Sequence, residues 1–185
     1  EGEGFGSWVR DTCHAAFRCQ NLLAPDEARE SLSYISEHGF NNGVDCAAMP
    51  AIAAWDHYIT TGDIQLLYEM LPGIIKYAEE ADARYDEEMQ LVHATMCLAQ
   101  DAFEEPENGG YCLGTEIAFA LMYQDVARIC EVTGCYPERI KFWESRSKEM
   151  LASIKEKYWN EEKECFTSGP IGSEAYEKGW WETTG

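Results

Sequence analysis

Basic residues are scarce in this sequence. It contains 14 Lys and Arg against 34 Asp and Glu, which gives a formal net charge of −20 at pH 7. Because nucleic acids and anionic membrane surfaces are bound by clustered cationic side chains, we expect neither as a partner. A neutral ligand such as a sugar is compatible with this charge, and solubility alone explains most of the acids.

Long apolar runs are absent as well. No stretch approaches the roughly 20 apolar residues that a membrane-spanning helix needs, and no signal peptide is visible. The sequence begins with Glu1 rather than Met. A leader or an upstream domain that has been removed is therefore compatible with it.

Motifs for metals, nucleophiles and nucleotides are also missing. None of the eight cysteines forms a Cys-x-x-Cys pair, and His14 next to Cys13 has no second pair to match it. We therefore expect no metal site. The sequence lacks a Gly-x-Ser-x-Gly elbow, a P-loop and a dinucleotide fingerprint, and we expect no cofactor. Several cysteines lie in apolar helical stretches, which favours reduced thiols and a cytoplasmic location, although their even number also permits disulfides.

What the sequence does contain is helical periodicity along most of its length. Six helices are predicted, at residues 8–23, 25–38, 45–59, 64–83, 115–131 and 137–158. The third helix is rich in alanine, which favours burial between neighbouring helices. Between residues 84 and 115 the sequence instead predicts a short strand or hairpin followed by a polar loop. Residues 160–185 are predicted to form a loop.

Several helix boundaries carry clear signals. Gly62 suits the left-handed position after a helix, and Asp63 suits the N-cap of the next one. Pro72 predicts a kink or a break in the fourth helix. A second Thr-Gly turn, at Gly134, again joins two helices, so the chain contains three helical hairpins. This repetition favours a ring of hairpins, with a plain six-helix bundle as the alternative.

Three motifs resemble those of a known family. They are the segment GSWVRDT at residues 6–12, Val44-Asp45 before the alanine-rich helix, and YITTGD at residues 58–63. The sequence resembles the six-hairpin glycosidases, most of all the amylo-α-1,6-glucosidase (glycogen debranching) group and its bacterial relatives. The resemblance covers about residues 5–80 and 100–160.

This resemblance implies an all-α fold made of helical hairpins of an (α/α)6 toroid. Such a toroid has twelve helices, so the six helices predicted here amount to about half of a barrel. We therefore expect residues 1–185 to be part of a single catalytic barrel domain. Its partner is then either the remainder of the barrel or a second copy in a homo-oligomer, because a half toroid would expose its inner helix faces.

The resemblance also assigns residues to a sugar pocket. It implies that Asp11 lines the pocket, with Arg10 orienting it, and that Asp45 adds a second carboxylate. Glu116 opens a later inner helix and is a further candidate for a catalytic role. In each case the alternative is an ordinary helix cap or an acid in the first turn that complements the helix dipole.

Glycoside hydrolysis needs two carboxyl groups, of which one protonates the leaving oxygen and the other activates water or attacks carbon. The Trp-Met-Asp segment in which the related group carries its acid is absent here. We expect Glu104 to be the general acid, with Asp101 as the next candidate, because neighbouring carboxylates raise one another's pKa. The alternative is a solvated acidic loop. A second catalytic carboxylate is expected beyond Gly185.

Aromatic rings stack on the apolar faces of sugars, and the chain has six tryptophans. Trp8, close to Arg10 and Asp11, is the best candidate for such stacking. Trp180 and Trp181 follow, because adjacent tryptophans in a glycine-flanked loop are hard to bury in one core.

These features predict an enzyme that hydrolyses a glycosidic bond in a neutral oligosaccharide, with inversion implied by the resemblance alone. A sugar epimerase or a disaccharide phosphorylase is the alternative on the same barrel. A non-catalytic helical scaffold is the alternative of another class. Convergence of Asp11, Asp45 and Glu116 with Trp8 at one end of the helices favours the sugar site, and dispersal favours the scaffold.

Overall fold

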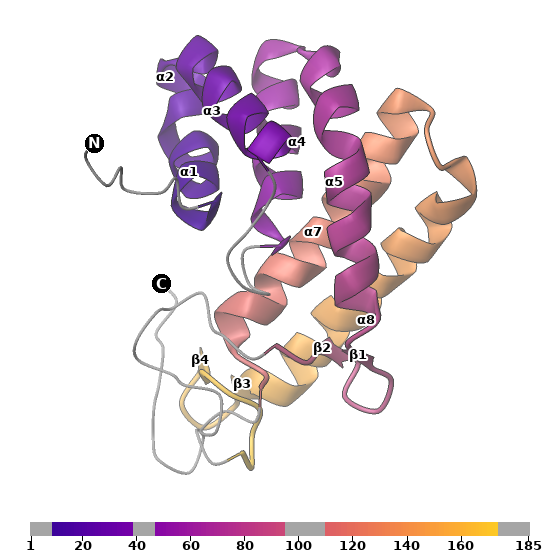
Figure 1. Ribbon diagram of the computed structural model, residues 1–185. Coiled ribbons are helices and arrows are strands. Elements are labelled where there is room, and N and C mark those ends of the chain that lie inside the picture. Colours follow the sequence, from indigo (N-terminus) through magenta and orange to yellow (C-terminus); the bar gives the residue numbers. More distant parts are fainter. Residues whose placement is uncertain (1–8, 39–46, 95–109, 174–185) are drawn as a thin grey trace, which may run out of the picture.

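The computed structural model describes residues 9–38, 47–94 and 110–173 (Figure 1). The helices of these ranges are α1 (Val9–Ala15), the π-helix η1 (Ala16–Gln20), α2 (Asn21–Leu23), α3 (Pro25–His38), α4 (Met49–Thr61), α5 (Ile64–Asp82), α7 (Leu113–Thr133), the 3-10 helix η3 (Pro137–Arg139) and α8 (Ile140–Tyr158). The strands form two short antiparallel ribbons, β1 (Tyr85–Asp86) with β2 (Leu91–Val92) and β3 (Trp159–Asn160) with β4 (Cys165–Phe166). The prediction of an all-α fold built from helical hairpins is confirmed.

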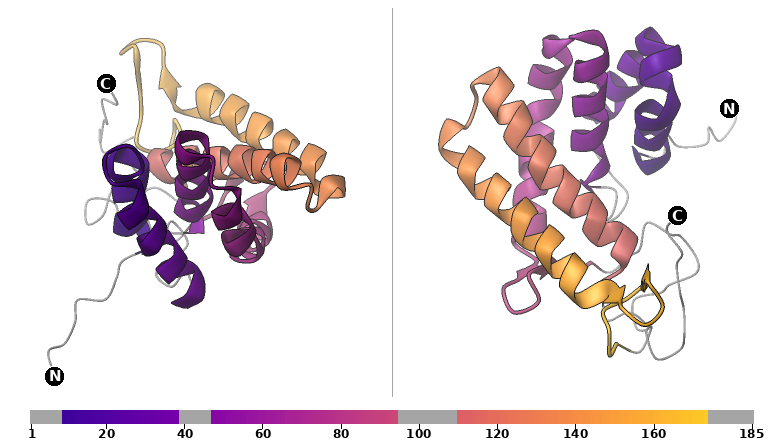
Figure 2. Two further views of the ribbon diagram at one scale, coloured as in Figure 1. Left: turned by 90° about the horizontal axis from the view of Figure 1, so that it is seen from above. Right: turned by 180° about the vertical axis from the view of Figure 1, so that it is seen from behind.

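The helices are arranged in two rows (Figures 1 and 2). α4 contacts α1 on one side and α7 on the other, and these three helices make up the inner row. In the outer row, α3 contacts α5, while α8 packs along α7. Successive helices alternate in direction, so the three helices of the inner row run parallel to one another (Figure 1).

Both rows contribute buried residues to the core. The predicted burial of the alanine-rich helix is confirmed, because α4 buries residues on several of its faces. On α7, the ring of Tyr123 stacks on that of Trp143 from α8, with centroids 5.4 Å apart, and both side chains are fully buried. Truncating an aromatic residue at such a site costs about 3 to 5 kcal/mol. No helix of the described ranges has both the length and the apolar character needed to cross a bilayer.

The turn between α4 and α5 has the predicted chemistry. Gly62 adopts a φ of 78°, and its N–H donates to Tyr58 O over 2.7 Å. Asp63 Oδ1 then accepts the N–H groups of Gln65 and Leu66 at 3.0 and 3.2 Å, which caps α5. Both signals are local in sequence, because a left-handed residue and an N-cap depend only on their immediate neighbours.

The connections differ in length at the two ends of the helices. At one end, Ala24 alone separates α2 from α3, and residues 62–63 separate α4 from α5. At the other end, residues 39–48 lead from α3 to α4, and residues 83–112 lead from α5 to α7. The long connections therefore all enter the inner row at the end where its helices begin.

Of the predicted kink or break at Pro72, the break does not occur, because α5 runs without interruption from Ile64 to Asp82. A proline cannot donate to the carbonyl four residues earlier, which here belongs to Tyr68. Both Pro72 and Tyr68 lie on the exposed face of α5. Water can hydrate the freed carbonyl there, so the helix continues.

Other boundaries also differ from the expectation. The predicted helix at 8–23 contains a π-helical stretch in its middle, and the predicted loop after residue 160 contains β4. α4 begins at Met49 instead of residue 45, with Pro50 in its first turn. That start follows from Pro50, which is tolerated only where its missing N–H would be unpaired anyway.

The expectation of reduced cysteines is corrected at one position. Cys112 is disulfide-bonded, and its partner lies outside the described residues. The described cysteines that form no disulfide are Cys13, Cys19, Cys130, Cys135 and Cys165. A disulfide next to the start of α7 shows that apolar surroundings alone do not predict the redox state of a cysteine.

Candidate functional site

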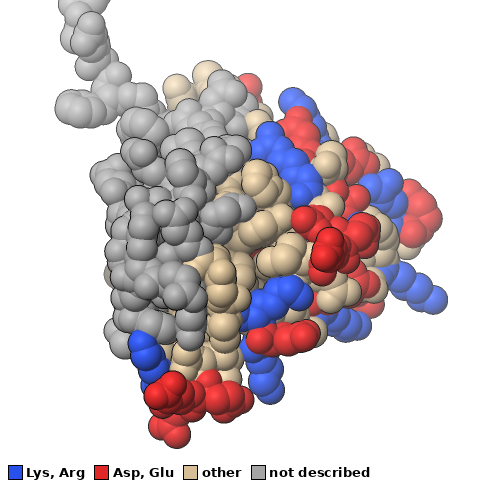
Figure 3. All heavy atoms as spheres, turned by 90° about the horizontal axis from the view of Figure 1, so that it is seen from below, with Lys and Arg blue, Asp and Glu red and all other residues tan. Residues whose placement is uncertain are grey.

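Each of the three inner helices begins at its lower end in Figure 1. Arg10 and Asp11 belong to the first turn of α1, and Glu116 to the first turn of α7. The segment that carries Asp45 leads into α4 at this same end. The parallel direction of the inner row therefore gives α1 and α7 starts that face the same way, with Asp11 and Glu116 in their first turns. The described surface seen from this end carries interspersed acidic and basic side chains (Figure 3).

Arg10 and Asp11 form an ion pair at this end. Arg10 Nε lies 3.5 Å from Asp11 Oδ1. The Arg10 side chain is 9 % exposed, whereas that of Asp11 is 65 % exposed. Asp11 is therefore free to accept hydrogen bonds from a ligand, while the buried guanidinium restricts its orientation.

Glu116 is the most deeply buried acid of this end. Its exposure is 0 %, and Oε2 accepts the N–H of Val92 from β2 at 3.0 Å. Oε1 has no hydrogen-bond partner among the described residues. Burial raises the pKa of Glu116 well above its ordinary value, and the bond from Val92 opposes this shift only in part.

Other polar side chains surround the first turn of α7. The Tyr111 hydroxyl donates to Asp86 Oδ2 at 2.8 Å, and the Tyr158 hydroxyl donates to Tyr111 O at 3.1 Å. The ring of His93 meets that of Tyr111 edge to face, with centroids 5.4 Å apart. Asp86 accepts hydrogen bonds from the N–H of Met89 and from the Tyr111 hydroxyl, and these two bonds are the main causes that lower its pKa.

The acidic segment with Asp101 and Glu104 enters and leaves at this end. Its described flanks are Ala94 and Gly110, and Ala94 N–H donates to Gly110 O at 2.9 Å. Both ends of the segment are therefore held together near the start of α7. The remaining predicted site residues, Trp8, Asp45, Asp101, Glu104, Trp180 and Trp181, lie outside the described residues.

Sequence reasoning missed Asp86, Tyr111 and Asp125. Burial is the main cause that raises the pKa of Asp125 to about 7, although Arg128 Nη1 lies 2.9 Å from its Oδ1. No short motif marks these residues, since Asp86 and Tyr111 meet across 25 positions, and the Asp125–Arg128 pair is an ordinary i,i+3 pair on one helix. Helical periodicity around Asp125 was the only available signal, since it places this acid on a helix with several apolar faces. The described residues contain no group of three or more His, Cys, Asp or Glu side chains that could hold a metal ion.

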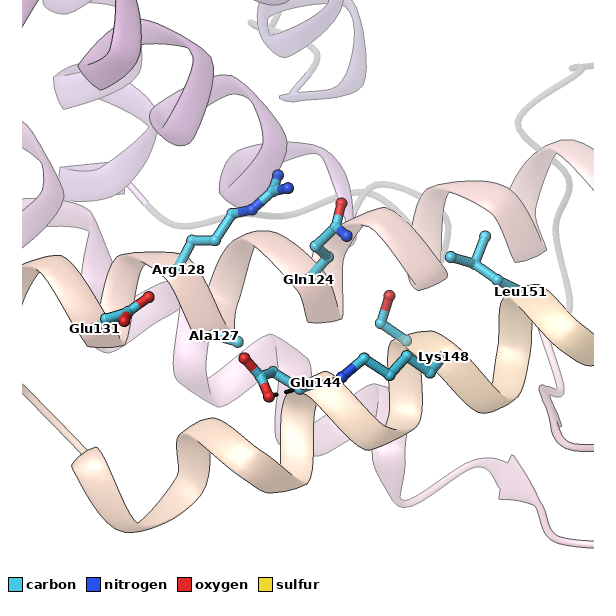
Figure 4. A pocket seen from close by; sticks show the side chains of 8 residues that line it. Gln124, Ala127, Arg128, Glu131, Glu144, Lys148 and Leu151 are labelled. Atoms are coloured by element: carbon cyan, nitrogen blue, oxygen red, sulfur yellow. Dashed lines mark ion pairs between the residues drawn. The ribbon is translucent and has the colours of Figure 1, made fainter.

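Two grooves follow the seam between α7 and α8. The first has a volume of about 270 Å³ and a largely polar lining of Gln124, Ala127, Arg128, Glu131, Glu144, Ser147, Lys148 and Leu151 (Figure 4). The second has a volume of about 520 Å³ and a mostly apolar lining of Ile117, Leu151, Ile154, Lys155, Trp159, Glu161 and Phe166. Leu151 belongs to both, so the grooves adjoin. The first groove lies along the middle of this hairpin, whereas the second reaches the start of α7, because Ile117 follows Glu116 directly.

Comparison with known proteins identifies the fold but not the family. No family model matches the chain, and no curated protein matches it. Among solved structures it is similar to a rhamnosidase from Klebsiella oxytoca with rhamnose bound, with a TM-score of 0.66 and 14 % identity. The match covers 88 % of this chain and 35 % of that chain. At this identity the likeness concerns the fold, and the described helices match part of an (α/α)6 rhamnosidase barrel.

Proposed function

We propose that this chain forms part of a glycoside hydrolase that binds an oligosaccharide where its inner helices begin. One observation carries the proposal, namely the convergence of the starts of α1, α4 and α7 in a fold similar to a rhamnosidase. The exposed carboxylate of Asp11 at this end can accept hydrogen bonds from sugar hydroxyls. The debranching group suggested by the sequence remains a more specific prediction within this proposal.

We propose Glu104 as the general acid, with Asp101 as the next candidate. The acid has to stay protonated until it donates to the leaving oxygen, which crowding by other carboxylates favours. The anchoring of both segment ends near the start of α7 supports this assignment. The second carboxylate lies elsewhere in the complete barrel, and inversion requires it to stand about 6.5 to 9.5 Å away to leave room for water.

The remaining predicted residues take binding roles. Asp11, oriented by Arg10, and Asp45 hold sugar hydroxyls, while Trp8, Trp180 and Trp181 stack on sugar rings. Glu116 is sealed from solvent in this structure. Its neutral carboxyl therefore acts in catalysis only if the segments near it move, and otherwise it braces β2 against α7.

The proposal is tested by assaying the intact protein with 4-nitrophenyl α-L-rhamnoside and 4-nitrophenyl α-D-glucoside. We expect Glu104→Gln to lower kcat by about 100-fold or more, because a general acid contributes about that much. Glu138→Gln serves as the matched control, since Glu138 is exposed in the turn after α7 at the opposite end. Full activity of Glu104→Gln would move the assignment to Asp101.

Inversion is tested by following with NMR which anomer is released first. An inverting enzyme releases the anomer opposite to that of the substrate.

An absence of hydrolysis across a panel of oligosaccharides would contradict the proposed enzyme and favour the helical scaffold.

We also propose that further helices complete the ring, either from the remainder of the barrel or from a second copy. The chain spans about a third of the length of the rhamnosidase that it matches. The cytoplasmic location remains a prediction, and the disulfide at Cys112 weighs against it. Disulfides persist mainly in oxidising compartments.

A further inference from the structure

We propose that Asn21, Arg29, His57 and Asp63 form a pH-sensitive lock between the first helical hairpin (α1 to α3) and the second (α4 and α5). The neutral imidazole of His57 holds the two hairpins together, and its protonation loosens their junction as the pH falls. All four residues belong to the described ranges, and their arrangement is independent of the proposed function.

His57 is a buried residue at the place where the two hairpins meet. It lies on α4 and is 2 % exposed. Asn21 of α2 contacts one of its ring nitrogens, and Asp63, the N-cap of α5, lies near the other. Histidine is the side chain whose ordinary pKa places its change of charge between pH 5 and 8. A change of charge at this place therefore acts on both hairpins at once.

The amide of Asn21 determines which nitrogen of neutral His57 carries the proton. Asn21 Nδ2 donates to Asp56 Oδ2 at 2.7 Å and to Ala53 O at 3.3 Å. Turning the amide over would place its oxygen against these two acceptors. Asn21 Oδ1 therefore faces His57 Nδ1, which lies 3.0 Å away. Because Oδ1 can only accept, the neutral imidazole carries its proton on Nδ1.

The other ring nitrogen, Nε2, is then the atom that takes up a proton. It lies 3.9 Å from Asp63 Oδ2. That oxygen already accepts from Arg29 Nε at 2.8 Å, and Arg29 Nη2 donates in turn to Glu69 Oε1 at 2.9 Å. A protonated His57 would therefore have to share one carboxylate oxygen with a guanidinium that is already held in place.

The surroundings of His57 act on its pKa in both directions. Burial, which is the largest cause, and Arg29 of α3 lower the pKa, whereas three carboxylates raise it, namely Asp63 before α5, Asp56 of α4 and Asp26 of α3. The outcome is a pKa that is lowered from 6.5. The unfolded chain therefore takes up the proton first, and the folded state loses stability as the pH falls from 6.5 to the folded pKa.

The first test compares the wild type with His57→Asn by urea unfolding of the intact protein between pH 5 and 7.5. Asparagine keeps an N–H group near the position of Nδ1 but takes up no proton. As the pH falls, we expect the unfolding equilibrium constant of the wild type to rise relative to that of the variant. The rise approaches about tenfold for each pH unit between 6.5 and the folded pKa. Asp125 of α7, which also packs on α4, has a pKa of about 7 but is present in both proteins and cancels.

Two further variants serve as controls. His38→Asn removes an exposed histidine from the end of α3 and retains His57, so it should keep the rise of the unfolding constant at acidic pH. His57→Gln places its amide near the position of Nε2 and loses the donor to Asn21. It should be less stable than His57→Asn at pH 7.5, while both lack the rise at acidic pH.

NMR of the wild type tests the lock without a variant that has to fold. We expect the imidazole nitrogen signals to show the proton on Nδ1 at pH 7.5 and uptake of the second proton with a midpoint below 6.5. Over the same range, hydrogen exchange corrected for its intrinsic pH dependence should become faster at Gln65 and Leu66, whose N–H groups donate to Asp63. The Leu113 amide, which donates to Ser168 O away from this junction, should not change.

Three results would each overturn the lock. They are a proton on Nε2 of His57 at pH 7.5, parallel unfolding profiles of the wild type and His57→Asn, and exchange at Gln65 and Leu66 that changes no more than at Leu113. The absence of any glycosidase activity would contradict the proposed function but would leave these measurements unaffected.

Discussion

Glu116 is a residue whose pKa is set by its buried surroundings. A glutamate in the unfolded chain ionises near its ordinary pKa of 4.5, whereas burial raises the pKa of the folded residue well above that value. Between the two pKa values, the folded state therefore binds one proton more than the unfolded state. The free energy of unfolding must then fall as the pH rises through this window.

This predicts a measurable difference between the wild type and Glu116→Gln. The glutamine can still accept the N–H of Val92 but has no proton to lose. Relative to the wild type, we expect the variant to gain about 1 kcal/mol for each pH unit between pH 5 and the folded pKa. Urea unfolding of both proteins at several pH values provides the measurement.

Asp125, whose pKa burial raises to about 7, contributes a fall of the same sign to both proteins. It therefore cancels in the difference between them. Parallel pH profiles for the wild type and Glu116→Gln would show that Glu116 is ionised in the folded protein.

Among the elements, the turn from α4 to α5 shows what local sequence determines. Asp63 caps α5, and its Oδ2 also accepts from Arg29 Nε of α3 at 2.8 Å. Burial acts to raise the pKa of Asp63, but the hydrogen bonds from Leu66 N–H and Arg29 outweigh it, and the pKa is lowered. The carboxylate thus contributes stability above its unfolded pKa of 3.8. That stability is lost as the pH falls through the folded pKa.

We expect Asp63→Ala to lower the free energy of unfolding by about 1 to 2 kcal/mol, because it removes an N-cap together with a partly exposed ion pair. Asp63→Asn should lose less, since an amide oxygen still caps the helix. Thermal or urea unfolding at pH 7 separates the two variants. Equal losses would mean that the ion pair with Arg29 outweighs the cap.

The elements also show where sequence reasoning stops. Gly62, Asp63 and Pro50 determine helix boundaries through neighbours a few residues away, so their effects were predictable. Pro72 was misjudged because its tolerance depends on which face of α5 is exposed. The contact between Asp86 and Tyr111 joins residues 25 positions apart across a segment without periodicity, and no local pattern indicates it.

At the scale of the whole molecule, one side of the α7–α8 hairpin carries the two grooves and is not covered by other described helices. Leu151 lines both grooves of this side and is 42 % exposed in the described structure. If further helices of the ring cover it, a carboxylate at this position would lose its hydration, and only Lys148 and Lys155 of the groove linings stand at helical spacing to pair with it. We therefore expect Leu151→Glu to lower the free energy of unfolding of the intact protein by about 2 kcal/mol or more.

Ile171→Glu is the matched control, because Ile171 is 46 % exposed and lines neither groove. A surface substitution of this kind changes stability by only about 0.5 kcal/mol. Chemical unfolding of both variants gives the comparison. Similar small effects would contradict the idea that another helix packs against α7 and α8.

The unequal lengths of the connections limit where such a ring can accept insertions during evolution. Where α4 passes to α5, two residues make the turn, and an insertion would disturb a cap and a left-handed glycine at once. Where α5 passes to α7, a stretch of 83–112 is available; its Leu91 and Val92 are buried against the helices, and the remainder can vary in length and composition. The short turns at one end thus tolerate few changes in sequence, whereas the long connections at the other end tolerate more. New specificities are expected to arise by remodelling the long connections, with the helices inherited unchanged.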